Sequence, residues 1–417
     1  MQSIIIKNIK QLVGIQEAWT TCRKGSEMNH LQCLDNGYLI LKDERIFDFG
    51  TMEKWHSNPS RIDADILEID ATGKLVFPSY CDSHSHAVFA GSREEEFVDR
   101  IKGLTYQQIA AKGGGILNSA AKLAMASEEE LYESAWSRLQ GLIKTGTGAL
   151  EIKSGYGLSL ESELKMLRVI KKLKADSPLT IKATFLGAHA VPLLFKDNKE
   201  GYINLLINEM MPAIANENLA DYCDVFCEQN YFTKEETILI LNTGKGYGMI
   251  PKVHAEQLSH SGGIEAGVSC GAISVDHLEY ADANDIELLL NSKTMPTILP
   301  GAAFFLNLPN PPARAFIDSG LPLAIASDYN PGSSPSGNMN MMLSIASIQY
   351  KMTPAEVINA ATINSAYAMG VSASHGSITR GKGANIFITK EIPSYSFIPY
   401  SFGVDLIETV ILKGEVV

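Results

Sequence analysis

Eight short apolar runs, most of which end in polar residues, constrain the fold of this chain more than any other feature. The runs are rich in Val, Ile, Ala and Phe, and they cover residues 74–86, 147–157, 180–190, 222–232, 251–257, 272–280, 294–301 and 321–332. Stretches between them, such as 127–146 and 159–177, begin with Ser and carry apolar residues at helical spacing. Eight strands that alternate with helices are the number required for a (β/α)8 TIM barrel. A doubly wound α/β sheet would also use parallel strands, but the first helix lacks its G-x-G-x-x-G opening.

The two ends of the chain have a different texture. Residues 1–75 contain strand-like runs between polar turns, and the same pattern returns near the C-terminus, at 383–390 and 406–417. We therefore expect a small β-sandwich domain built from residues 1–75 plus 380–417, beside a barrel that spans 76–379.

Composition excludes several classes of function. The 35 Lys and Arg against 47 Asp and Glu give a net charge of −12, and no basic run is long enough to follow a phosphate backbone. The sequence has neither a secretory leader pattern nor an apolar run long enough for a membrane span. Its six cysteines are scattered, which is typical of reduced thiols. We expect a cytoplasmic protein that binds neither nucleic acid nor membrane.

Polar side chains gather where the predicted strands end. In a barrel these carboxyl ends meet at one mouth, where active sites are built. The residues concerned are His84 and His86 after the first strand, Tyr156 after the second, His189 after the third, His254 and Gln257 on the fifth, His277 on the sixth and Asp328 on the eighth.

This series suggests a metal site. His84 and His86 are two residues apart, so both imidazoles point to the same side of a strand, although such a pair is also common on exposed strand ends. His254 and Asp328 complete a ligand set that suits zinc or ferrous iron. Such an ion lowers the pKa of a bound water from 15.7 to about 7, which predicts hydrolysis. His277 could orient or deprotonate the water, or it could be a hydrogen-bonded histidine of the barrel rim.

These residues resemble the amidohydrolase superfamily, in which D-x-H-x-H follows the first strand (82–86), a His lies on the fifth and sixth strands, and Asp follows the eighth. Longer motifs are similar to the imidazolonepropionase family. They are HAVFAGSREEEF (86–97), YQQIAAKGGGI (106–116), EIKSGYGL (151–158), FLGAHAVP (185–192), VHAEQLSHSGG (253–263), VDHLEY (275–280), TILPGAAFFL (297–306) and ASDYNPGSSPS (326–336).

The resemblance implies hydrolysis of the ring amide of 4-imidazolone-5-propanoate to N-formimidoyl-L-glutamate in histidine degradation, with one divalent ion, Zn²⁺ or Fe²⁺. It also implies a role for each matched residue. Metal ligands would be His84, His86, His254 and Asp328; catalytic residues would be His277, Asp328 and Gln257; substrate-binding residues would be Arg93, Tyr156, His189 and Ser333, with Asn330 and Gly332 at positions that hold the product.

Elementary chemistry agrees with two of these roles and questions a third. Arg93 can hold a propanoate carboxylate with two parallel hydrogen bonds, although it could instead neutralise the acidic residues that follow it. Tyr156 could donate a hydrogen bond to the same substrate, or it could be a rim aromatic. Related enzymes can have Glu where this chain has Gln257, and an amide cannot transfer a proton at neutral pH.

Several alternatives stay open at this point. Lys153 is expected to be an ion-pair partner and not a metal ligand, which favours one metal, while Glu228 leaves an opening for a second. A deaminase or a cyclic amidase acting on another heterocycle would share the metal ligands. A non-catalytic barrel is a further class, although no ligand is missing. A homodimer that acts on a small carboxylate-bearing substrate fits this interpretation.

Overall fold

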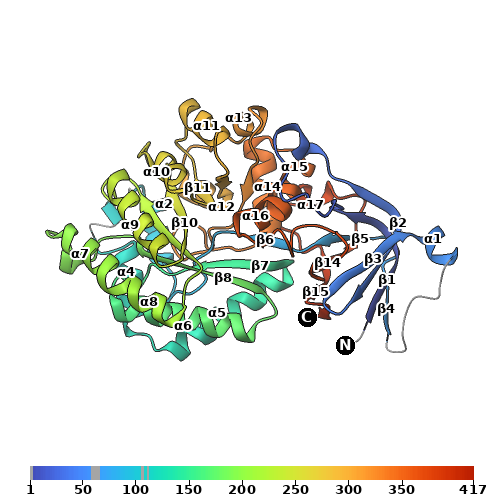
Figure 1. Cartoon of the computed structure of the whole chain (residues 1–417), viewed down its shortest axis with the longest axis horizontal. Coiled ribbons are helices and arrows are strands. Elements are labelled where there is room, and N and C mark those ends of the chain that lie inside the picture. Colours follow the sequence, from blue (N-terminus) through green and yellow to red (C-terminus); the bar gives the residue numbers. More distant parts are fainter. Residues whose placement is uncertain (1–2, 58–65, 105–107, 110–111) are drawn as a thin grey trace.

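The structure is a computed structural model that describes residues 3–57, 66–104, 108–109 and 112–417. Residues 106, 107, 110 and 111 of the motif at 106–116 lie outside the described part. Eight parallel strands form the barrel in the order β13-β12-β11-β10-β9-β8-β7-β6. They are β6 (Tyr80–Asp82), β7 (Thr147–Lys153), β8 (Thr180–Ala188), β9 (Tyr222–Cys227), β10 (Ile250–Ala255), β11 (Ser274–His277), β12 (Met295–Ile298) and β13 (Ala324–Ile325). The predicted TIM barrel is confirmed, with one barrel strand in each apolar run; residues 74–78 of the first run belong instead to the small sheet (Figure 1).

The first and last barrel strands meet just beyond their carboxyl ends. Ser85 and Tyr329 form a parallel bridge, and the amide N–H of Asp328 donates to the carbonyl oxygen of His84 at 2.9 Å. Asp82 reinforces this seam, because its Oδ1 accepts the amide N–H of Ser327 at 2.9 Å. The seam therefore places two segments of the predicted metal site, 84–86 and 328, side by side.

Helices cover the outside of the barrel. The two predicted from sequence are α5 (Glu128–Lys144), which Ser127 and Glu130 cap reciprocally, and α6 (Leu160–Asp176), which Ser159 caps. The others in the described residues are α2 (Glu94–Ile101), α4 (Ile116–Met125), α7 (Lys199–Leu205), α8 (Met211–Glu217), α9 (Lys234–Gly246), α10 (Gly263–Cys270), α11 (Ala283–Leu290), α12 (Pro300–Leu306), α13 (Ala313–Asp318), α14 (Met339–Tyr350), α15 (Pro354–Asn359), α16 (Ser365–Ala368) and α17 (Phe397–Tyr400). A further helix, α1 (Met52–Ser57), belongs to the small domain and lies away from the barrel. Short 3₁₀ turns lie at Gly25–Asn29 and Leu193–Phe195, and π-helical turns at Leu206–Met210 and Ala360–Asn364. None of the helices in the described ranges is long and apolar enough to cross a bilayer.

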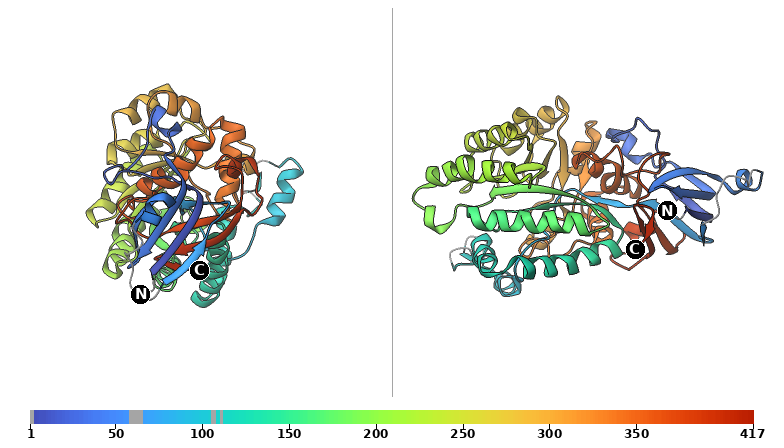
Figure 2. Two further views of the ribbon diagram at one scale, coloured as in Figure 1. Left: turned by 90° about the vertical axis from the view of Figure 1, so that its right-hand side faces the viewer. Right: turned by 60° about the horizontal axis from the view of Figure 1, so that its bottom comes forward.

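Both chain ends contribute to one small sheet, as predicted (Figure 2). Its strands are β1 (Ser3–Val13), β2 (Cys33–Lys42), β3 (Arg45–Thr51), β4 (Ile66–Asp70), β5 (Lys74–Pro78), β14 (Ile386–Glu391), β15 (Ile407–Leu412) and β16 (Glu415–Val416). The sheet is continuous and mostly antiparallel, but β4 and β5 run parallel to β1. It curls far enough for Arg45 at the start of β3 to bridge to Gly383, just before β14.

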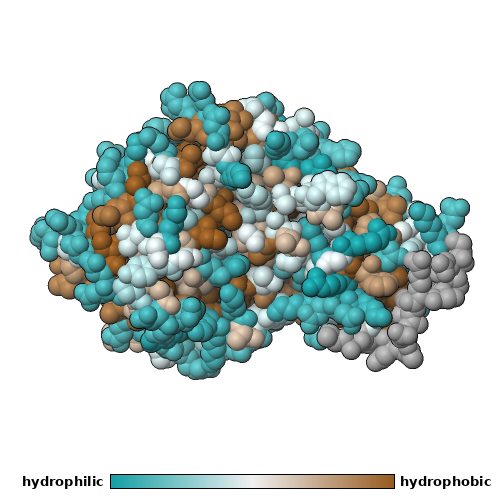
Figure 3. All heavy atoms as spheres, in the orientation of Figure 1, coloured by the Kyte–Doolittle hydropathy of each residue, from teal (hydrophilic) through white to brown (hydrophobic). Residues whose placement is uncertain are grey.

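The small sheet has apolar side chains on both faces. In β14, Ile386 and Ile388 belong to the core inside the curled sheet, whereas Phe387 packs into the core of the barrel. The barrel contact is at the amino end of β7, where Phe387 and Ile407 come within 3 Å of the space that a side chain on Gly146 would occupy. The small domain thus lies at the end of the barrel opposite the carboxyl ends of the strands. On the face drawn in Figure 3, hydrophilic and hydrophobic residues are interspersed over both domains.

Candidate functional site

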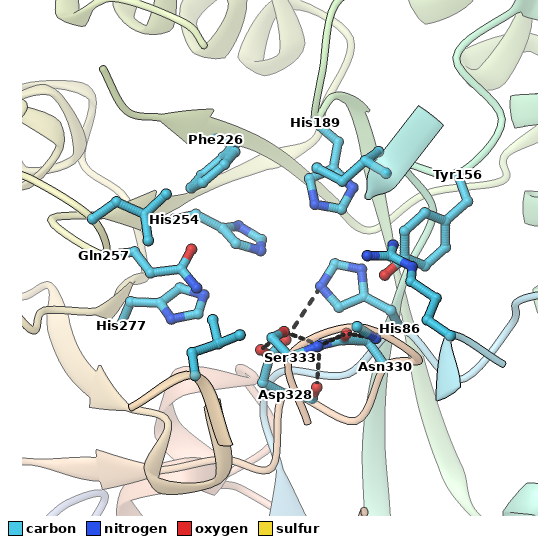
Figure 4. A pocket seen from close by; sticks show the side chains of 15 residues that line it. His86, Tyr156, His189, Phe226, His254, Gln257, His277, Asp328, Asn330 and Ser333 are labelled. Atoms are coloured by element: carbon cyan, nitrogen blue, oxygen red, sulfur yellow. Dashed lines mark hydrogen bonds and ion pairs between the residues drawn. The ribbon is translucent and has the colours of Figure 1, made fainter. Parts of the chain in front are cut away.

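A pocket opens at the carboxyl ends of the barrel strands, and it collects nearly all the residues that the sequence marked (Figure 4). Its lining comprises His86, Arg93, Ile116, Tyr156, His189, Phe226, His254, Gln257, Leu258, His277, Leu306, Asp328, Asn330, Gly332 and Ser333. His84 lies at the floor with no exposed surface. The eight-stranded topology therefore brings segments more than 200 residues apart in sequence into one site.

The four predicted metal ligands face one another at this floor. His84 Nε2 and His86 Nε2 lie 3.6 and 3.5 Å from Asp328 Oδ1. The rings of His84 and His254 are 4.4 Å apart between centroids. Candidate ligand atoms of His84, His86 and Asp328 all lie within 4.8 Å of one another, as do those of His84, His254 and His277. The distances suit a single ion held between the strand ends.

The hydrogen bonding of these imidazoles supports a metal as their partner. His84 Nε2 and His254 Nε2 are buried, and neither has a hydrogen-bond partner among the described residues. An unsatisfied polar atom in the interior carries a desolvation cost of about 1–3 kcal/mol. Imidazole nitrogen and carboxylate oxygen are ligands that zinc and ferrous iron accept. The donor set therefore fits a divalent transition-metal ion.

Burial also keeps His84 and His86 in the neutral form that a metal ligand requires. Burial, together with the positive charge of Lys153, holds the pKa of His84 well below its usual value. Burial and the neighbouring His189 do the same to the pKa of His86. Both imidazoles are consequently uncharged at neutral pH.

A layer of charged residues beneath the histidines was not assigned to the site from the sequence. Asp276 Oδ2 lies 2.6 Å from His84 Nδ1, and Asp224 Oδ2 lies 3.0 Å from His254 Nδ1. Each carboxylate faces the ring nitrogen that points away from the pocket, an arrangement that fixes the orientation of a metal-binding imidazole. In the sequence, each of these two carboxylates appears as a single acidic residue within an otherwise mainly apolar strand.

Two lysines balance these carboxylates. Lys153 Nζ lies 2.6 Å from Glu151 Oε1 and 2.7 Å from Asp224 Oδ2, and Lys252 contacts Glu151. All of these side chains are completely buried. Lys153 is therefore an ion-pair partner, as the sequence indicated, and it lies below the metal ligands.

His277 sits at a strained turn. The residue itself has φ +92° and Leu278 has φ +73°, values that side chains other than glycine rarely adopt and that often mark functional sites. Burial alone would lower the pKa of His277, but the carboxylates of Glu279, Asp328 and Asp276 outweigh it and raise the pKa. His277 is thus better able to accept a proton than His84, His86 or His189.

The residues predicted to bind substrate lie on the other side of the pocket. Arg93 is 8% exposed, its Nε donates to Ser119 Oγ at 2.9 Å, and its guanidinium lies 5.7 Å from the centre of the Tyr156 ring. Glu96 is 3.9 Å from Arg93 Nη1, which is longer than a hydrogen bond. Arg93 is consequently a buried cation facing the pocket, with only a weak acidic partner.

His189 has a defined tautomer. Its Nδ1–H donates to the carbonyl oxygen of Gly155 at 3.0 Å, and burial beside His254 lowers its pKa to about 3. Gly155 has φ +103°, and a side chain there would collide with His189 and Leu186. The neutral ring therefore has an unprotonated Nε2, which can accept a hydrogen bond.

The loop after β13 supports Asp328. Ser333 Oγ donates to Asp328 Oδ2 at 2.9 Å, and Asn330 Oδ1 accepts the amide N–H groups of Gly332 and Ser333, both at 2.8 Å. A side chain at Gly332 would overlap the guanidinium of Arg93. Glycine is therefore required at this position if Arg93 is to reach the pocket.

Gln257 lines the pocket near His277 (Figure 4). Glu228, the candidate for a second metal, instead accepts the amide N–H of Leu258 at 2.8 Å and contacts Ser259. The sequence reasoning missed the apolar wall formed by Ile116, Phe226, Leu258 and Leu306. Nothing in a single apolar residue distinguishes a pocket wall from a core position, so no signal for this wall was present.

Comparison with known proteins agrees with the geometry. The amidohydrolase family model matches residues 232–417. The chain is 54% identical to the imidazolonepropionase of Flavobacterium johnsoniae over 413 residues, which cover 99% of each chain. It is 51% identical to the imidazolonepropionase of Christiangramia forsetii over 415 residues, covering 100% of each. Among solved structures, E. coli guanine deaminase superposes with a TM-score of 0.74 at 14% identity, covering 100% of this chain and 99% of that one, which shows a shared fold.

Proposed function

Because this chain belongs to the imidazolonepropionase family of amidohydrolases, we propose that it hydrolyses the ring amide C–N bond of 4-imidazolone-5-propanoate. The product is N-formimidoyl-L-glutamate, and the reaction belongs to histidine degradation. The observation that carries this proposal is one pocket with a metal-type ligand set on one side and the buried cation Arg93 on the other. The ligand set suits metal-dependent hydrolysis, and the cation of Arg93 suits binding of the propanoate carboxylate.

His84, His86, His254 and Asp328 would hold one divalent ion, Zn²⁺ or Fe²⁺. When bound, the ion supplies a Lewis acid that lowers the pKa of water and polarises a carbonyl group. Asp276 and Asp224 keep the rings of His84 and His254 turned toward it.

The substrate is oriented by its carboxylate. Arg93 takes the propanoate in a bidentate pair, and Tyr156 adds a hydroxyl on the same side. The unprotonated Nε2 of His189 accepts an N–H of the imidazolone ring and does not donate to an oxyanion, because its proton is on Nδ1. Asn330, Gly332 and Ser333 line the same pocket, where Ser333 would contact the substrate and Asn330 and Gly332 would hold the product.

Proton transfer falls to His277. It accepts a proton from the attacking water while the water oxygen bonds to the ring carbonyl carbon. The C–N bond then breaks, and His277 returns the proton to the leaving nitrogen, so that one water is consumed. Asp328 helps to align the water, and the Gln257 amide hydrogen-bonds the ring without carrying a proton.

The proposal extends to the wider properties of the protein. It comprises a composite domain of residues 1–75 and 380–417 beside a barrel of 76–379, a cytoplasmic location, a homodimer, and no nucleic-acid or membrane partner. The strand bounds support a composite domain of both chain ends, with its first segment extending to Pro78, where β5 ends, and the net charge of −12 supports the absence of a nucleic-acid partner.

Turnover of 4-imidazolone-5-propanoate by protein of measured metal content tests the proposal. Arg93→Met should reduce kcat/KM by about 30- to 10³-fold, mainly through KM, because a buried charged hydrogen-bonded contact contributes about 2–4 kcal/mol. Arg168→Met, which removes a surface arginine paired with Glu217, is the matched control and should leave kcat/KM unchanged. Unchanged kinetics in Arg93→Met, or turnover only of a heterocycle without a carboxylate, would contradict the assignment and favour a deaminase or another cyclic amidase.

A further inference from the structure

Glu279 is a buried carboxylate that the reaction described above does not use. Its side chain has no exposed surface, and neither carboxylate oxygen has a hydrogen-bond partner among the described residues. A buried carboxylate without a partner is strongly unfavourable, so it is rarely retained without a specific role. His277 Nδ1 lies 3.7 Å from Glu279 Oε1.

The backbone brings this pair together. If β11 continued as a regular strand, the backbone of residues 277 to 279 would run straight on, away from the barrel mouth. The positive φ angles of His277 and Leu278 turn the chain sharply after β11, and the amide N–H of Tyr280 then donates to the Glu256 carbonyl oxygen at 2.9 Å. This turn holds Glu279 beside the imidazole at the expense of local backbone strain, which points to function.

His277 Nδ1 is complementary to this carboxylate. It is buried and, like the Glu279 oxygens, it has no hydrogen-bond partner within the described ranges. The separation of 3.7 Å exceeds a hydrogen bond but lies within the reach of an ion pair. Catalytic hydrogen bonds are often long before substrate binds and shorten in the complex.

We propose that Glu279 is a positioning residue that fixes the ring orientation and tautomer of His277. The carboxylate accepts a hydrogen bond from Nδ1–H, which leaves Nε2 unprotonated and directed to the pocket. When Nε2 takes a proton, the carboxylate stabilises the resulting imidazolium. Glu279 thereby acts on the reaction through His277 without touching the substrate.

The negative charge of Glu279 also acts on a tyrosine hydroxyl. Burial and then the negative charge of Glu279 raise the pKa of the Tyr350 hydroxyl, which lies at the end of α14. That hydroxyl is buried and has no hydrogen-bond partner in the described part of the chain. No lysine or arginine forms an ion pair with Glu279 among the described residues, so His277 is the group whose charge can compensate it.

The inference rests on the proposed function, and two measurements test it. In ¹⁵N-histidine NMR spectra of the zinc-loaded protein, with the His277 signals identified by their loss in His277→Ala, wild type should show the Nδ1–H tautomer. Glu279→Met, which offers Nδ1–H no acceptor, should shift the ring toward the Nε2–H tautomer. The same variant should lower kcat by about 10- to 10³-fold with KM within about threefold of wild type.

Stability separates positioning from a structural role. Glu279→Gln and Glu279→Met should unfold at or above the wild-type midpoint, because both remove a buried charge that no lysine or arginine of the described residues neutralises. Glu356→Gln is the control: this carboxylate is equally buried but is paired with Arg314 at 2.9 Å, so stability should fall while kcat and the His277 tautomer stay unchanged.

An unchanged His277 tautomer in Glu279→Met, or a kcat within about twofold of wild type in both Glu279 variants, would overturn the proposal. Failure of the proposed function is distinguishable. It would appear as absent turnover in wild type, whereas the tautomer measurement needs no substrate.

Discussion

Two polar layers are stacked inside this barrel, and they are equally buried but differently satisfied. In the lower layer, Lys153 and Lys252 contact Glu151, and Lys153 also lies 2.7 Å from Asp224. In the upper layer, His84 Nε2 and His254 Nε2 have no hydrogen-bond partner among the described residues. Burial therefore does not separate structural from functional polar residues here. What separates them is whether their bonding capacity is used within the protein.

Asp276 joins the two layers. One oxygen faces His84 at 2.6 Å, and the same oxygen lies 3.8 and 3.7 Å from Lys153 and Lys252. The lower layer thus serves as a rigid charged base that orients the histidines above it. Substitutions in the upper layer should therefore lower the catalytic rate, and substitutions in the lower layer should first lower the stability of the fold.

The largest effect is expected in the upper layer. His277→Ala should lower kcat by about 10²- to 10⁴-fold because it removes the group that accepts and returns the proton. Metal content and the unfolding midpoint should stay close to wild type, as measured by elemental analysis and thermal denaturation. His260→Ala, at a half-exposed histidine outside the pocket, is the control. A near-normal rate in His277→Ala would remove it from the base role.

A change confined to the lower layer should affect stability instead. Lys153→Met removes the buried cation that Glu151 and Asp224 share and leaves their charges only partly compensated, by Lys252 and His254 respectively, so the free energy of unfolding should fall by about 3–5 kcal/mol in denaturant titrations. Lys172→Met is the matched control, since Lys172 forms a partly exposed pair with Glu129 at 3.1 Å that contributes at most about 1 kcal/mol. Equal effects of the two variants would show that the lower layer is not the base described above.

The smallest effect should come from the residue that links the layers. Asp276→Asn keeps the shape of the side chain but weakens its hold on His84, so metal affinity should fall by about 10- to 100-fold in a chelator competition. The far-ultraviolet circular dichroism spectrum should be unchanged. Metal affinity equal to that of wild type would mean that His84 is held in place without Asp276.

Much of the fold was predictable from local pattern. The order of the elements predicts the barrel: apolar runs with strand propensity alternate with capped helices, such as the one capped by Ser127. This order can be read from the sequence because each element is specified by residues that are neighbours along the chain. Both ends of the chain contain strand-like runs between polar turns, although the sequence did not indicate that the resulting sheet would be continuous and curled. The pairing of β3 with the segment before β14 joins residues more than 300 positions apart, and periodicity carries no information on such pairs.

The site divides in the same way. The sequence by itself determined which side chains carry the chemistry, because His-x-His, a later His and a terminal Asp stand at the ends of strands that a parallel barrel must bring to one mouth. Only the tertiary structure decided which polar residues support them. Asp224, Asp276 and Glu279 are single acidic residues in buried segments, and their roles depend on distances across the barrel and on a backbone turn at His277. Such distances follow from packing and closure of the whole sheet, which no local stretch of sequence specifies.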